Sequence, residues 1–85
     1  MLSFGNAKII ASTFIKVEDL EIRIEKLKFE AGQEKISLFS TDKGKEISRS
    51  ILLSEEELLE LLHQAIHSGV LPGNFIGNLR ERIEI

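Results

Sequence analysis

Hydrophobic and polar residues alternate along the first half of the chain in a pattern that predicts β-strands. In the clearest case, Leu20, Ile22 and Ile24 alternate with charged residues at a period of two, which is typical of a strand with one covered face. Leu27 and Phe29 continue the alternation one residue late. We interpret this slip as a β-bulge near Glu25 and Lys26 that keeps both apolar sets on the core face.

Four segments of this kind follow one another. They cover residues 7–15, 20–30, 35–40 and 45–53. Turn-forming residues separate them, most clearly at positions 41–44, where Gly44 is available for a positive φ. Because parallel pairing needs a crossover of about a dozen residues, these short connections predict an antiparallel meander.

After residue 53 the apolar pattern changes to a helical period. Apolar residues then recur three and four positions apart, at Leu58, Leu59, Leu61, Leu62, Ala65 and Ile66. Ser54 and Glu57 are spaced as a capping box, and Gly69 followed by Pro72 ends the helix. The sequence therefore predicts a long helix over residues 54–68 that buries its leucine face.

The last residues predict a short terminal helix, because Phe75, Leu79 and Ile83 recur at a spacing of four after an N-cap at Asn74. The alternation of Ile83 and Ile85 leaves a terminal strand as the alternative. Together the elements predict one α+β domain over residues 1–85. In it, a four-stranded antiparallel meander sheet is packed by the long helix, with the short helix after it.

The amino-acid composition limits the chemistry and the cellular environment that we expect for the protein. Cysteine is absent, which excludes disulfides and thiolate chemistry and favours a reducing, cytoplasmic environment. The longest apolar runs are far below the ~18 residues of a membrane span, so we expect a soluble protein with no membrane partner. The formal net charge is −3. The negative net charge comes from the residues after 53, which hold two basic and six acidic residues, whereas residues 1–53 hold nine basic and eight acidic residues.

No arrangement of residues indicates an enzyme. The carboxylates and serines do not form an acid/base pair or a nucleophile with its base, and no glycine-rich loop joins a strand to a helix. His63 and His67 lie one helical turn apart, but no third ligand is indicated elsewhere. We therefore expect no catalytic residues, no metal and no cofactor.

Two surfaces are candidates for binding. The outer face of the predicted sheet displays Arg23, Lys26, Lys28, Lys35 and Phe39, where cations neutralise phosphates and an exposed ring stacks on a base. The helix side opposite the leucines displays Glu56, Glu60, His63 and His67, which suits a basic protein partner. The first surface predicts binding of single-stranded nucleic acid, and the second predicts protein binding.

The segment from Ile36 to Ile66 has a strand, a lysine/glycine hairpin, a strand with Ser48 and Arg49, and a helix opened by Ser54. This order resembles the second half of a Pur repeat and, more loosely, Whirly-type single-stranded DNA-binding proteins. Those families bind single-stranded nucleic acid on the sheet and pair two ββββα units. The resemblance thus implies that one such unit works as a homodimer.

The leading hypothesis is therefore a small, non-enzymatic nucleic-acid-binding protein that uses the outer sheet face as a homodimer. The alternative is a small acidic protein-binding module. It is an adaptor, or an inhibitor of a basic partner that processes nucleic acid, and it uses the glutamate-rich side of the helix.

Overall fold

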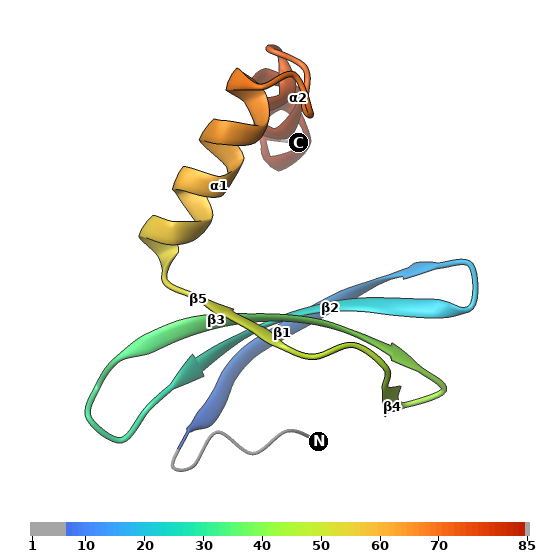
Figure 1. Cartoon of the computed structure of the whole chain (residues 1–85), viewed down its shortest axis with the longest axis vertical. Coiled ribbons are helices and arrows are strands. Elements are labelled where there is room, and N and C mark those ends of the chain that lie inside the picture. Colours follow the sequence, from blue (N-terminus) through green and yellow to red (C-terminus); the bar gives the residue numbers. More distant parts are fainter. Residues whose placement is uncertain (1–6, 85) are drawn as a thin grey trace. The chain divides into compact units, whose positions relative to one another are not determined.

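The computed structural model describes residues 7–84 and has the α+β class expected from the sequence (Figure 1). Strands occupy the first part of the chain, and two helices follow. The chain divides into two compact units, one up to Glu55 and one from Glu56. The single domain and the packing of the long helix on the sheet stay predictions.

The first unit is an antiparallel sheet, which confirms the predicted meander. Its strands are β1 (Lys8–Val17), β2 (Leu20–Lys28), β3 (Glu34–Asp42), β4 (Lys45–Glu46) and β5 (Ile51–Leu53). The order is β1-β2-β3, and both β4 and β5 pair with β3 (Figure 1). Four strand positions therefore lie side by side, and β4 and β5 share the last one.

Two-residue turns close the β1–β2 and β3–β4 hairpins, and residues 29–33 connect β2 with β3. In the turn between β3 and β4, Lys43 has a φ of 53° and Gly44 a φ of 84°. Positive φ at both central positions is the geometry whose twist matches that of paired strands. The predicted positive φ of Gly44 is confirmed. Glu18, in the turn between β1 and β2, also has a positive φ, of 58°.

The bulge lies in β1, so the predicted bulge in β2 is wrong. The ladder between β2 and β3 is continuous over the whole of β2. In β1, Ile9 pairs with Leu27 and Ala11 pairs with Lys26, which leaves Ile10 as the extra residue. A central strand loses hydrogen bonds on both sides if its ladder is disrupted, whereas β1 is the outer strand of the described order. The irregularity is therefore accommodated where it breaks fewer bonds.

The predicted fourth strand is interrupted. β4 and β5 pair with β3 in registers that differ by two residues, and residues 47–50 between them belong to no strand. Ser48 Oγ closes the gap by accepting hydrogen bonds from the Ser40 N–H at 2.8 Å and the Ser40 hydroxyl at 2.9 Å. Arg49 lies in this gap and is exposed.

The helices are α1 (Glu55–His67), which belongs to the second unit from its second residue on, and α2 (Phe75–Ile83). α1 starts directly after Ser54, as predicted, and with 13 residues it is short. Gly69 follows it with a φ of 86°, and its N–H donates to the Ile66 carbonyl at 3.2 Å. α2 confirms a terminal helix rather than a strand, although the Asn74 side chain makes no capping bond. Neither of these helices has the length and apolar character needed to span a membrane.

Two glycines of this unit give a matched test. Gly69→Ala is expected to lower the free energy of unfolding by about 1 kcal/mol, because a Cβ is strained at a left-handed φ. Gly77→Ala, within α2 and with open space around the new Cβ, is expected to raise it by about 0.5–1 kcal/mol. Urea unfolding followed by circular dichroism measures both, and equal effects of the same sign would contradict the assignment of Gly69.

Candidate interaction surfaces

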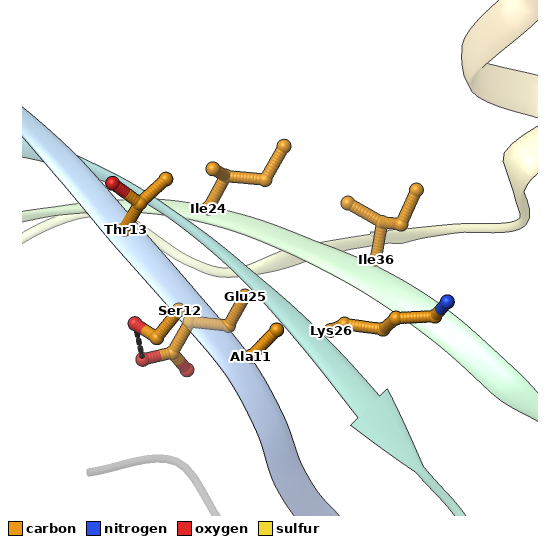
Figure 2. Close-up of a pocket in the computed structure, with 7 residues that line it drawn as sticks. All are labelled: Ala11, Ser12, Thr13, Ile24, Glu25, Lys26 and Ile36. Atoms are coloured by element: carbon orange, nitrogen blue, oxygen red, sulfur yellow. Dashed lines mark hydrogen bonds between the residues drawn. The ribbon is translucent and has the colours of Figure 1, made fainter.

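The strand register divides the sheet into two faces of different character, because directly paired residues of an antiparallel ladder project to the same side. The first, called here the apolar face, carries Thr13, Ile15, Val17, Leu20, Ile22, Ile24, Ile36, Leu38, Ile51 and Leu53, and the same side also carries Lys8, Ala11, Lys26, Lys28, Glu34, Ser40 and Asp42. The second, the polar face, carries Ser12, Phe14, Lys16, Glu21, Arg23, Glu25, Leu27, Lys35, Ser37, Phe39, Thr41 and Leu52. Figure 2 shows Thr13, Ile24 and Ile36 on one side and the bonded pair Ser12–Glu25 on the other.

Much of the apolar face is open to solvent. Ile15 is 64% exposed, Ile51 57% and Ile22 39%. Within residues 7–84, Leu27 is the one hydrophobic side chain that is buried, and it belongs to the polar face. Burying one exposed Ile or Leu side chain contributes roughly 1.5–3 kcal/mol. Covering several side chains of the apolar face with another apolar surface would therefore be strongly favourable.

A hollow on this face lies beside the β1 bulge. Ala11, Thr13, Ile24 and Ile36 contribute to its lining (Figure 2). Ala11 pairs directly with Lys26 after the extra residue Ile10. The small side chain of Ala11 leaves room between its larger neighbours. The face is therefore hollowed, rather than flat, next to the bulge.

The polar face is built around a row of three residues that are paired across β1, β2 and β3: Phe14, Arg23 and Phe39. The Arg23 guanidinium carbon lies 4.8 Å from the centroid of the Phe14 ring, which is a cation–π contact. Arg23 Nη1 lies 3.0 Å from Glu21 Oε1, and its Nε lies 4.0 Å from Glu25 Oε2. The charge of Arg23 is therefore neutralised within its own strand.

Hydroxyls extend this network. Thr41 donates to Glu21 Oε1 at 3.3 Å, and Ser12 donates to Glu25 Oε2 at 3.1 Å. The carboxylates that hold Arg23 are themselves fixed from β3 and from β1. The groups around Arg23 are thus bonded to one another, whereas the hydroxyl of Ser37, which is fully buried on the same face, has no hydrogen-bond partner within residues 7–84.

The five residues predicted to bind nucleic acid do not share one face, and that part of the prediction is wrong. Arg23, Lys35 and Phe39 lie on the polar face, where Arg23 and Phe39 are directly paired. Lys26 and Lys28 project to the opposite side, in line with Ile24. The cause is the unbroken register of β2, since the predicted bulge would have moved the two lysines to the side of Arg23.

An ion pair also engages Lys26. Its Nζ lies 3.0 Å from Glu34 Oε1. The hydrogen bond and the charge of Glu34 raise the pKa of Lys26, and the same contact lowers the pKa of Glu34. Both side chains are substantially exposed, so the pair exchanges readily with solvent ions.

The helix residues predicted to bind a protein are all exposed on α1. Gln64 donates to Glu60 Oε2 at 2.7 Å, and His63 Nδ1 lies 3.7 Å from the same oxygen. The rings of His63 and His67 have centroids 6.4 Å apart. Glu60, His63 and His67 are therefore close together, and Glu56 lies one turn earlier. Among the described residues, no group of three or more His, Cys, Asp or Glu side chains could hold a metal ion.

Two features were not predicted from the sequence. Phe14 is the aromatic partner of Arg23, and Lys8 lies directly opposite Lys28 in the β1–β2 ladder. Both depend on the pairing of β1. The one local signal for Phe14 was its position in an apolar strand segment, which does not distinguish the two faces.

No family model, curated protein or solved structure matches the chain. The resemblance to Pur repeats and Whirly-type proteins stays a likeness in the order of the elements. The functional argument therefore depends on the geometry of the surfaces described above.

The pair between Lys26 and Glu34 gives a direct prediction. The pKa of the Glu34 carboxyl, followed by NMR, is expected below its ordinary value of 4.5 in the native protein and closer to it in Lys26→Met. Stability from the pair is then present above about pH 4.5 and lost as the pH falls through the lowered pKa. Lys45→Met, at the other end of the sheet, serves as the control. An unchanged Glu34 pKa in Lys26→Met would contradict the pair.

Proposed function

We propose that the protein is a non-enzymatic protein-interaction module that works as a homodimer. The observation that carries this proposal is the apolar face of the sheet, on which four strand positions present Ile, Leu and Val side chains, while the charged residues of the same side lie toward the ends of the strands. Contiguous apolar surface of this kind is typical of protein–protein contact sites.

Chain length supports the same conclusion. An 85-residue chain buries only about 60–65% of its unfolded surface, so its free energy of unfolding is small without added contacts. A second copy adds burial to both chains at once, because a two-fold interface uses the same patch twice. Self-association would thus supply additional apolar contacts to both chains.

The acidic side of α1 suits a different partner. Among the described residues, neither Glu56 nor Glu60 forms an ion pair with a Lys or Arg side chain, and the nearby His63 is exposed. Negative charge that is not neutralised within its own unit attracts a basic surface and speeds encounter with it. A dimer would present this side twice, as an adaptor or an inhibitor of a basic protein does.

Sedimentation velocity tests the homodimer. The native chain is expected to sediment with twice the 9.6 kDa mass of one chain at micromolar concentration. Its thermal midpoint is expected to rise with protein concentration, because association stabilises the folded state by mass action. A folded species of 9.6 kDa that persists to millimolar concentration would overturn the proposal.

Single-stranded nucleic acid is the second candidate ligand. The observation that favours it is the group of lysines at one end of the sheet, where Lys8 lies directly opposite Lys28 and Lys26 projects to the same side. Lysines that lie so close together suit phosphates, and ion pairing with phosphate releases counterions.

Fluorescence anisotropy with a labelled single-stranded oligonucleotide tests this candidate. It predicts micromolar or tighter binding that weakens steeply with salt and is lost in Lys26→Ala/Lys28→Ala. Lys43→Ala/Lys45→Ala removes the same charge from the other end of the sheet and is expected to bind as the native chain does. Absence of binding at low salt, or equal loss in both variants, would remove the candidate.

A further inference from the structure

Two imidazole rings lie one helical turn apart on α1. His63 and His67 are spaced i and i+4, and residues at this spacing have Cβ atoms about 5–6 Å apart. The two ring centroids are 6.4 Å apart, and the ring planes are inclined by 56°. Both side chains are exposed, so the rings can rotate without displacing a packed neighbour.

The separation of the rings is close to that of a metal chelate. Two imidazoles that bind one zinc ion at a tetrahedral angle, through bonds of about 2.0–2.1 Å, have ring centroids about 5 Å apart. The observed 6.4 Å therefore has to shorten by about 1.5 Å for both rings to reach one ion. Rotation of two exposed side chains supplies a movement of this size.

A carboxylate already faces one of the rings. His63 Nδ1 lies 3.7 Å from Glu60 Oε2, and Gln64 holds the same oxygen by donating to it at 2.7 Å. Histidines that bind metal usually direct the second ring nitrogen to a carboxylate, a carbonyl or water, which orients the ring and makes the ligand more basic. Because Nδ1 of His63 faces Glu60, its Nε2 is the nitrogen left for a metal.

We infer that His63 and His67 bind one borderline divalent transition-metal ion of the zinc class, through a ring nitrogen of each, with Glu60 as the group that orients His63. Imidazole suits zinc, copper and nickel, whereas magnesium and calcium prefer oxygen ligands. The site has two protein ligands, and water takes the other positions. It lies within one helix of one chain, so it does not rest on the proposed homodimer.

The sequence shows the spacing of the histidines alone, and without a third ligand it predicted no metal. The structure likewise adds no third ligand from the described residues, but it adds the contact between Glu60 and His63. A metal ion held by both rings links two successive turns of α1. Since such an ion binds the folded helix and not the unfolded chain, it stabilises the helix by mass action.

Calorimetric titration of the full chain with zinc chloride tests the site. The native chain is expected to bind zinc, and its thermal midpoint, followed by circular dichroism, is expected to rise with zinc concentration. His63→Ala and His67→Ala are each expected to weaken zinc binding at least about tenfold, because each removes one of the two ligands. Magnesium chloride is expected to give no comparable binding.

A matched control is His67→Ser/Ser68→His, which exchanges two neighbouring residues and keeps the composition and the net charge. It places the second imidazole five residues after His63, about 140° around the helix, where one ion cannot reach both rings. Circular dichroism verifies that each variant keeps its fold. Absence of zinc binding by the native chain at millimolar zinc would overturn the inference. Equal affinity of the exchanged variant, or equal binding of magnesium, would also overturn it.

The role of Glu60 has its own matched pair. Glu60→Ala is expected to weaken zinc binding about tenfold, the usual cost of losing a group that orients a metal-binding histidine. Glu56→Ala removes the same charge one turn earlier and is expected to have a smaller effect, because none of the contacts of His63 described above involves Glu56. Equal effects of the two variants would show a general effect of charge and overturn the orienting role.

Discussion

The sheet depends on the unbroken register of β2. Every residue of this strand pairs with β3, from Leu20 opposite Asp42 to Lys28 opposite Glu34. Because successive residues of a strand project to opposite sides, this single constraint assigns Arg23 to one face and its neighbour Ile24 to the other. A slip of one residue would exchange the two faces completely, so the separation of polar and apolar character is a property of the ladder.

The two faces differ in how far their side chains contact one another. On the polar face, Arg23 lies between two carboxylates and against Phe14, and each carboxylate accepts a further hydrogen bond from a hydroxyl. These ion pairs are half-buried, and they occupy the groups that would recognise a charged ligand. On the apolar face, Lys26 pairs with Glu34 near one end of the strands, whereas Ile15, Ile22 and Ile51 stay exposed.

The sequence predicted those features that have local signals. Gly44 and Gly69 mark left-handed positions by residue type, and the spacing of the leucines places α1 correctly. The bulge in β1 had no such signal, because residues 9–11 are all small or apolar and show no alternation that an extra residue would break. The assignment of Lys26 and Lys28 to the face of Arg23 failed for the same reason, since it depended on which strand contained that residue.

The extra residue in β1 has a consequence for the edge of the sheet. β1 is the outer strand of the described order, and an extended, regular outer strand can continue the sheet by pairing with any other chain. Ile10 interrupts the regular spacing of backbone donors and acceptors along that strand, and bulges also increase local twist. Open-ended strand addition at this edge of the sheet is thereby discouraged.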